Sequence, residues 1–99
     1  MHYQSISDVR KQIDELDSQL VKLIAQRGEC VKAAAAFKKD AQDVRAPDRV
    51  QQVIDKVSIL AQEHGLPQEI IQKIYRSMIE AFIDFELKQH QAINHSEAN

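Results

Sequence analysis

The chain has 99 residues, of which 43% are hydrophobic and 28% are charged, with a formal net charge of -2 at pH 7. Nucleic-acid-binding proteins usually carry a basic surplus, so this balance argues against a nucleic-acid partner. No signal peptide is evident and no apolar run is long enough to cross a membrane, so we expect no membrane association and a cytoplasmic location. The single cysteine, Cys30, excludes an internal disulfide, and we expect it to be a small core residue.

Helix-breaking residues are rare, since the chain contains only two glycines and two prolines. Apolar residues recur at three- and four-residue intervals over three segments, which is the spacing of amphipathic helices. We therefore predict an all-α chain of three helices that forms a single domain over residues 1–99. Its core is expected within residues 6–90, and the polar segment 92–99 is expected to be a flexible tail.

The first predicted helix is the longest and runs from about Ser5 to about Lys39. Ser5 or Ser7 can cap its amino end, and Asp8 in the first turn suits the helix dipole. Residues at alternating three- and four-residue steps form one seam along it: Ile6, Val9, Ile13, Leu16, Leu20, Leu23, Arg27, Cys30, Ala34 and Phe37. Arg27 stands where an apolar side chain is expected, and a buried guanidinium needs a counter-charge. Either its head reaches water or a glutamate, or an anionic ligand neutralises it.

The length of this first helix bears on the assembly of the protein. A helix of about 35 residues extends roughly 50 Å. A compact domain of about 100 residues has a radius of gyration of about 13 Å, so such a helix overshoots a monomer of this size. Its apolar seam would be exposed in a single chain. We therefore expect a homodimer in which a partner covers the first helix.

The remaining sequence predicts a loop and two further helices. The polar segment 40–46 is predicted to be the loop. Pro47 suits the first turn of a second helix that runs to about His64, Gly65 suits the cap at its end, and Pro67 opens the third helix. The residues predicted to face inward are Val50, Val53, Ile54, Val57, Leu60 and Ala61 in the second helix, and Ile70, Ile71, Ile74, Met78, Phe82 and Phe85 in the third.

Four cations could converge on one anionic ligand. Arg27 and Lys38 are eleven residues apart, about three helical turns, which puts them on one face with Cα atoms about 16 Å apart. Arg49, in the first turn of the second helix, could fold over the same space. Arg10 lies about 25 Å from Arg27 along the helix axis, so it could reach this ligand only from the partner chain of an antiparallel dimer. Taken singly, each cation could instead be a solvated surface charge.

Glu86 continues the apolar stripe of the third helix four residues after Phe82. Two roles are open for it: a structural salt bridge to one of the arginines, or a protonated carboxyl, favoured by burial, that donates a proton or hydrogen bond. The four histidines show no metal-ligand spacing, and no glycine-rich phosphate loop, nucleophile elbow or catalytic triad pattern is present. We therefore expect neither a metal nor a cofactor.

Residues 6–90 resemble the all-helical chorismate mutase family, including its isochorismate pyruvate lyase relatives. The resemblance rests on short motifs in a fixed order: Val9-Arg10-Lys11-Gln12-Ile13-Asp14, Ala25-Gln26-Arg27, Phe37-Lys38 and Ala46-Pro47-Asp48-Arg49-Val50. It implies an intertwined homodimer with two equivalent sites. Each site would bind a small dicarboxylate, chorismate or isochorismate, through Arg27, Arg49 and Arg10 of the partner subunit, with Lys38 donating to the ether oxygen of the substrate.

The resemblance also implies the chemistry. Chorismate rearranges to prephenate in a concerted pericyclic step, for which a protein needs only to fold the substrate into its reactive conformer and stabilise charge on the ether oxygen. Many members carry glutamine where Glu86 stands, so Glu86 would have to be protonated to donate there, and activity should then rise at mildly acidic pH. Typical mutases carry glutamate where Val50 stands, whereas the lyase relatives carry a small apolar residue.

Three functions follow from these patterns. The prediction is a chorismate mutase. The alternatives are an isochorismate pyruvate lyase that forms salicylate and pyruvate, and a non-catalytic helical dimerisation module whose inward charges are salt-bridged. A bicyclic dicarboxylate that mimics the transition state separates the enzymes from the module, because only a ligand that binds the folded state raises its melting temperature.

Overall fold

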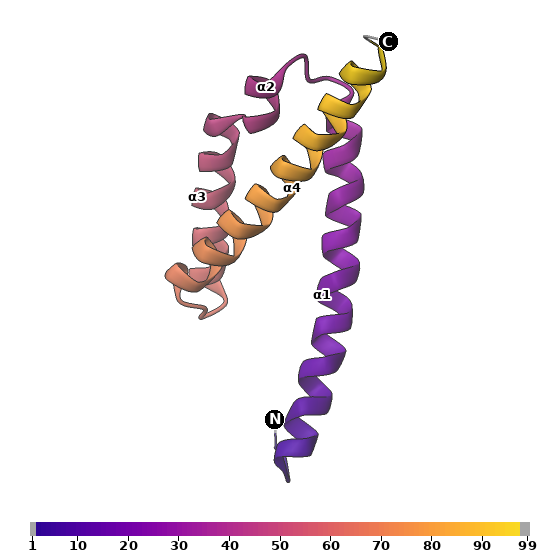
Figure 1. Cartoon of the computed structure of the whole chain (residues 1–99). Helices are drawn as coiled ribbons and strands as arrows, with labels where there is room; N and C mark the ends of the chain where they lie inside the picture. Colours follow the sequence, from indigo (N-terminus) through magenta and orange to yellow (C-terminus); the bar gives the residue numbers. More distant parts are fainter. Residues whose placement is uncertain (1, 98–99) are drawn as a thin grey trace. The chain divides into compact units, whose positions relative to one another are not determined.

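The computed structural model describes the backbone of residues 2–97 and the side chains of residues 2–89. That part of the chain contains four helices and no strand: α1 (Ile6–Ala35), α2 (Ala41–Arg45), α3 (Pro47–Glu63) and α4 (Gln68–Glu97) (Figure 1). The predicted all-α class is confirmed, and the three long helices correspond to the three predicted ones. The chain divides into two compact units, residues 1–33 and residues 34–99.

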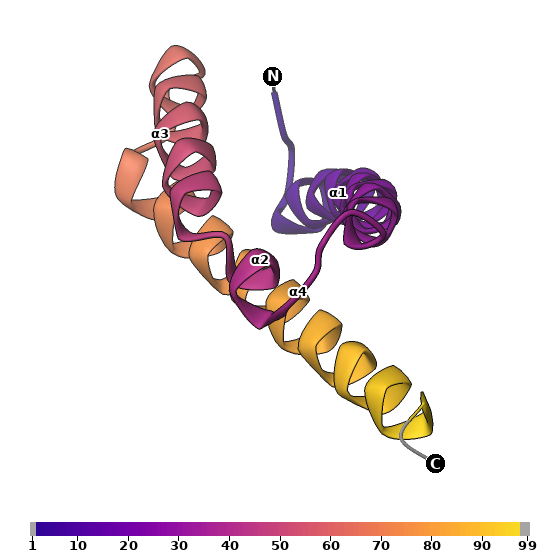
Figure 2. The same ribbon diagram turned by 90° about the horizontal axis from the view of Figure 1, so that it is seen from above.

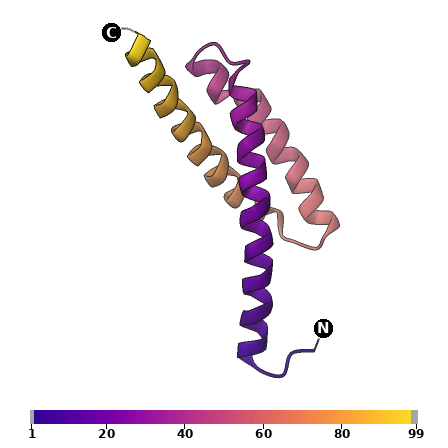
Figure 3. The ribbon, with the colours of Figure 1, turned by 90° about the vertical axis from the view of Figure 1, so that its right-hand side faces the viewer.

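The first unit holds the amino-terminal residues and most of α1, which Figure 3 shows as an uninterrupted helix. Ser5 caps this helix, because its Oγ accepts a hydrogen bond from the N–H of Asp8 at 3.2 Å. The carboxylate of Asp8 in turn accepts from the N–H of Gln4 at 3.3 Å. Of the two caps that the sequence allows, the structure uses Ser5, and two backbone donors at the helix start are satisfied by side chains.

The apolar seam of α1 is uncovered in the single chain, since none of the residues of this helix is buried. Leu20 is 54% exposed and Leu23 is 59% exposed. Ile6, Ile13 and Leu16 are exposed as well. Cys30 is also exposed, so its prediction as a core residue is wrong for the single chain. Exposed apolar residues at helical spacing are typical of a helix that packs against another polypeptide.

The end of α1 differs from the prediction. The helix ends at Ala35 rather than near Lys39, and the segment predicted as a loop contains α2. A tight turn follows α1, in which the N–H of Lys38 donates to the carbonyl of Ala35 at 3.1 Å. Asp40 caps α2 by accepting from the N–H of Asp43 at 3.0 Å, and Asp43 accepts from the N–H of Lys39 at 3.0 Å. These carboxylates accept hydrogen bonds from backbone N–H groups beyond α1. The chain can therefore end the helix at Ala35 with few backbone donors left unpaired.

In the second unit α3 packs against α4, and α2 also packs on α4 (Figure 2). The buried apolar residues come from all three helices: Val44, Ile54, Val57, Ala61 and Ile79. On α4 the prediction is partly wrong, because Ile79 is buried whereas Ile74 and Phe85, predicted to face inward, are 52% and 61% exposed. Together with Ile70, these two residues form a second apolar face of α4 that its own chain leaves uncovered.

The turn between α3 and α4 reverses the chain (Figure 3). Gly65 has a positive φ of 73°, a left-handed conformation that glycine adopts without steric cost. The N–H of Leu66 then donates to the carbonyl of Ala61 at 2.8 Å, which closes the end of α3. The predicted glycine cap is confirmed. Beyond this turn, α4 continues to Glu97, so helical backbone extends into the segment predicted to be a flexible tail; residues 98–99 lie outside the described part.

A buried hydroxyl fixes the register of α4 on α3. Ser58, which is buried, donates to the carbonyl of Ile54 at 2.7 Å and accepts from Nε2 of Gln72 at 3.0 Å. The hydroxyl therefore acts as donor and acceptor at once. Because Gln72 lies on the helix that carries Glu86, this contact helps to set the position of Glu86 along α3.

We expect Ser58→Ala to lower the free energy of unfolding by about 1–3 kcal/mol, because the Gln72 amide loses its partner in a part-buried position. Urea unfolding followed by circular dichroism measures this change. Gln68→Ala is the control, since it removes only the exposed hydrogen bond to Gln62 at 3.1 Å and should change stability by no more than about 0.5 kcal/mol. Equal effects of the two variants would show that Ser58 does not fix the register.

Candidate active site

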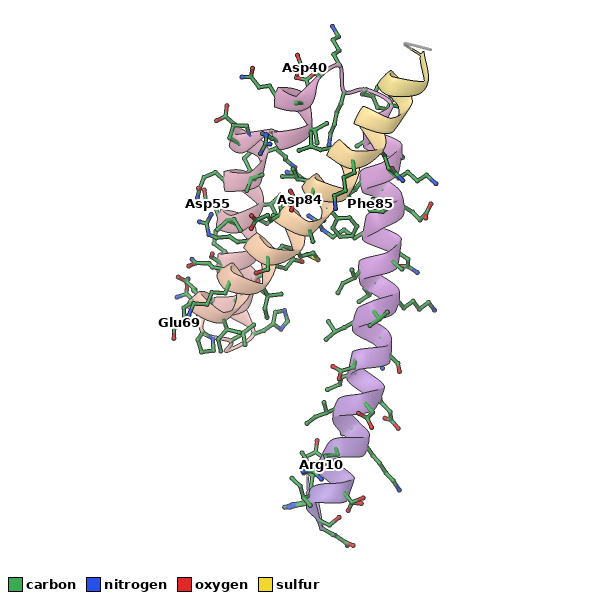
Figure 4. All side chains as sticks on the ribbon, viewed as in Figure 1. Arg10, Asp40, Asp55, Glu69, Asp84 and Phe85 are labelled. Atoms are coloured by element: carbon green, nitrogen blue, oxygen red, sulfur yellow. The ribbon has the colours of Figure 1, made fainter. Side chains whose placement is uncertain are left out.

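An ion pair joins Lys38 to Glu86. The Nζ of Lys38 lies 3.2 Å from Oε1 and 3.1 Å from Oε2 of Glu86. The two side chains are 23% and 9% exposed, so the pair is largely withdrawn from water. Lys38 belongs to the segment between α1 and α2, and Glu86 belongs to α4, where Figure 4 labels its sequence neighbours Asp84 and Phe85. The pair therefore ties the segment after α1 to the fourth helix.

The geometry of this pair determines what it can do chemically. Burying an ion is costly unless a close partner and hydrogen bonds offset the lost hydration, and here one ammonium serves both carboxylate oxygens. Both oxygens of Glu86 are acceptors in this arrangement, whereas donation to a ligand would require a proton on one of them. The Lys38 ammonium has three donors, one more than the two bonds to Glu86 use. The predicted burial of Glu86 is confirmed. Of the two roles left open for it, the structure shows a salt bridge, and the partner is Lys38 rather than an arginine.

The first turn of α3 presents Arg49. Pro47 occupies the start of this helix as predicted, and Asp48 lies in the first turn, where a carboxylate suits the helix dipole. Arg49 is exposed and Val50 is half-buried. The residue before Pro47, Ala46, adopts a left-handed conformation with φ 39° and ψ 62°. The motif at 46–50 is thus a helix start that leaves an arginine accessible to a ligand.

The other two predicted site residues, Arg10 and Arg27, lie on α1 in the first unit. Arg10 is exposed near the amino end of the helix (Figure 4), and Arg27 is half-buried. The prediction that Lys38 shares a face of the first helix with Arg27 is wrong, because α1 ends at Ala35 and Lys38 lies beyond it. Of the five predicted residues, the structure brings Lys38 and Glu86 into direct contact.

Two further properties hold for the described residues. They include no group of three or more histidine, cysteine, aspartate or glutamate side chains that could hold a metal ion. None of the helices in this part of the chain is both long and apolar enough to cross a lipid bilayer. Among the described side chains, the Lys38 ammonium and the exposed Arg49 guanidinium can offer a ligand positive charge and hydrogen-bond donors.

A family model described as chorismate mutase type II matches residues 9–87, which is most of the chain. The chain belongs to this family. The matched range contains all five predicted site residues: Arg10, Arg27, Lys38, Arg49 and Glu86. Membership in the chorismate mutase type II family confirms the resemblance found in the sequence and supports the prediction of an enzyme of this class.

The relatives that this chain resembles are named for different activities. A chorismate mutase of Methanocaldococcus jannaschii is 32% identical over 78 residues, which cover 78% of this chain and 79% of the relative. An isochorismate pyruvate lyase of Pseudomonas aeruginosa is 29% identical over 83 residues, which cover 84% of this chain and 82% of the relative. A bifunctional chorismate mutase/prephenate dehydratase of Aquifex aeolicus is 29% identical over 89 residues, which cover 86% of this chain but 25% of the relative. Similarity of this degree therefore does not by itself separate mutase from lyase.

Sequence reasoning missed two features close to the site. The capping of α2 by Asp40 and Asp43 had a signal, because a short polar residue followed three positions later by an acidic one is typical of a helix start. The left-handed conformation of Ala46 had none, because alanine rarely adopts it. Both features lie in the segment that leads from Lys38 to Arg49.

Proposed function

We propose that this chain catalyses the rearrangement of chorismate to prephenate. The observation that carries the proposal is the largely buried Lys38 ammonium, held by Glu86 in a member of the chorismate mutase type II family. The similarity to the Methanocaldococcus jannaschii chorismate mutase supports the same reaction. The substrate is a small dianion, and the proposed site is correspondingly rich in cations.

The proposed mechanism is electrostatic and conformational. In the concerted step the ether C–O bond breaks as a C–C bond forms, and negative charge grows on the ether oxygen. A fixed ammonium at that oxygen lowers the barrier, and Lys38 would supply it. Glu86 would hold Lys38 in place and, when protonated, donate to the same oxygen. Arg27 and Arg49 would bind the carboxylates and keep the substrate in its reactive conformer.

We infer that the active form is a homodimer and that each site takes Arg10 from the partner subunit. The uncovered apolar seam of α1 and the exposed apolar face of α4 support association, because covering such surface contributes about 25 cal/mol per Å². Arg10 and Arg27 lie about 25 Å apart along α1, too far to hold one small ligand. An antiparallel partner helix would bring a second Arg10 to the site that Arg27 serves.

A second candidate function is cleavage of isochorismate to salicylate and pyruvate. The observation that favours it is Val50, a half-buried apolar residue directly after Arg49, at the position where typical mutases carry a glutamate that contacts the ring hydroxyl. The similarity to the Pseudomonas aeruginosa isochorismate pyruvate lyase points the same way. Chorismate and isochorismate are both small dicarboxylates, so one cationic site could serve either.

The deciding experiment incubates the purified chain separately with chorismate and with isochorismate and identifies the products by chromatography. Prephenate from chorismate supports the proposed function. Salicylate with an equal amount of pyruvate from isochorismate supports the second candidate. A third outcome is that the chain turns over neither substrate and shows no rise in melting temperature when a bicyclic dicarboxylate that mimics the transition state is added. That result would indicate a non-catalytic dimerisation module.

Val50→Glu is expected to shift the preference between the two substrates. A carboxylate here can accept a hydrogen bond from the ring hydroxyl of chorismate, which we expect to raise kcat/KM for chorismate by about tenfold, equivalent to about 1.4 kcal/mol. Steady-state kinetics with both substrates measures the ratio. Val50→Leu is the control, since it changes size without adding an acceptor. An unchanged ratio in Val50→Glu would place residue 50 away from the ring.

A further inference from the structure

Ala46 has an unusual backbone conformation. Its φ of 39° and ψ of 62° lie in the left-handed region, and among the described residues it is the only one other than glycine with a positive φ. The Cβ of an L-residue is crowded there, so alanine adopts it only where surrounding structure enforces it. The next residue is Pro47, whose ring fixes its own φ and restricts the residue before it. The backbone dihedral angles of these two consecutive residues are therefore confined to narrow ranges.

Ala46 is also shared between two helices. Its N–H donates to the carbonyl of Gln42 at 2.9 Å and closes α2, while its carbonyl accepts from the N–H of Val50 at 3.0 Å and opens α3. No other residue separates the two helices, since α2 ends at Arg45 and α3 begins at Pro47. The dihedral angles of this one residue therefore set the direction in which the first turn of α3 leaves α2.

Both sides of this joint are anchored, and the first turn of α3 lies between the two anchors. On one side, buried Val44 holds α2, which packs on α4, the helix that carries Glu86. On the other side, the body of α3 is held by Ile54 and Val57, at least one turn beyond its first turn. Arg49 lies between these anchors and is exposed. Its position relative to α4 thus depends on the joint as well as on the core.

We propose that Ala46 is a positioning residue for Arg49: its left-handed conformation, held between the hydrogen bond that closes α2 and the one that opens α3, fixes the first turn of α3 so that the guanidinium faces the substrate anion. This inference rests on the proposed function, in which Arg49 binds a substrate carboxylate. Alanine serves this purpose better than glycine, because glycine would populate many other conformations at the joint.

The test compares two substitutions at residue 46. Ala46→Gly removes the crowded Cβ and also frees the joint, so we expect KM to rise by about three- to tenfold with kcat less affected. Ala46→D-Ala, made by chemical synthesis of the 99-residue chain, suits a positive φ and keeps the joint restricted, so KM should stay at the wild-type value. Ala41→Gly, at the exposed start of α2, is the control for a glycine away from the joint and should leave KM unchanged.

A second readout does not depend on turnover. Hydrogen exchange of the Val50 amide, which donates to Ala46, should be faster in Ala46→Gly than in the wild type and unchanged in Ala46→D-Ala. If wild-type KM and wild-type Val50 exchange both persist in Ala46→Gly, or if Ala46→D-Ala raises KM as much as glycine does, the positioning role is wrong. A wild-type chain inactive on both substrates would overturn the proposed function and this role with it, even if the exchange pattern showed that the joint holds the first turn.

Discussion

Lys38→Met is expected to lower kcat for the proposed reaction by a factor of about 100 to 1,000, which corresponds to about 3–4 kcal/mol of lost transition-state stabilisation. Methionine keeps most of the length of the side chain but has neither charge nor donor. The ether oxygen would then develop its negative charge without the ammonium that we propose lies against it. Steady-state kinetics, with KM measured alongside kcat, tests the expectation, and the larger loss should appear in kcat.

The same substitution also leaves the carboxylate of Glu86, whose side chain is 9% exposed, without its ammonium partner. We expect a loss of about 1–3 kcal/mol of folding stability from this cause. The control is the double variant Lys38→Met/Glu86→Gln, in which no unpaired charge remains and stability should largely return while activity stays low. Glu86→Gln alone keeps Lys38 and adds an amide donor, so it should remain active, with a flatter dependence of rate on pH.

These variants separate catalysis from structure. If the double variant recovered activity together with stability, Lys38 would be a structural residue and the proposed mechanism would be wrong. If Glu86→Gln left the dependence of the rate on pH unchanged, the role proposed for protonated Glu86 would be wrong, while its contact with Lys38 would stand.

Mixing two inactive variants is expected to restore activity. Arg10→Ala and Arg27→Ala should each lose most turnover alone, because each removes one arginine from both sites of the proposed dimer. Unfolded together at equal concentrations and refolded, they should regain about one quarter of the wild-type activity per chain. About half of the dimers would then be mixed, and each mixed dimer would hold one site with both arginines and one site with neither.

The value of about one quarter follows from the sharing of Arg10 across subunits. If both arginines of a site came from the same chain, every site in a mixed dimer would lack one of them, and the mixture would stay as inactive as its components. Refolding each variant alone is the control for recovery of protein. Sedimentation equilibrium of the mixture confirms that dimers have formed, so that a negative result contradicts the shared site and not the assembly.

The helices of this chain could be predicted from its sequence because each signal is local. Proline at position 47 and glycine at position 65 mark a start and an end whatever surrounds them, and the structure has both. The end of α1 could not be predicted in this way. Its apolar repeat continues to Phe37, but the helix ends at Ala35. The N–H groups of Phe37 and Lys38 form a tight turn on the carbonyls of Ala34 and Ala35, and the N–H of Lys39 donates to the carboxylate of Asp43.

The faces of α4 show a second limit of sequence reasoning. Periodicity locates apolar residues around a helix but does not say which neighbour covers them. Ile79 packs within its own chain, whereas Ile74 and Phe85 remain exposed there, although all three are large and apolar. The buried position of Glu86 could be predicted from the apolar stripe; its contact with Lys38 could not, because it spans 48 residues of chain and depends on where α1 ends.

In the proposed dimer, a helix of 30 residues that buries none of them in its own chain gains its tertiary support from a second molecule. Folding then obeys mass action: dilution should lower the thermal midpoint and concentration should raise it, with no change in sequence or buffer. A newly synthesised chain would stay incompletely folded until it bound a second copy of itself. The amount of active enzyme in a cell would therefore rise more steeply than the number of chains produced.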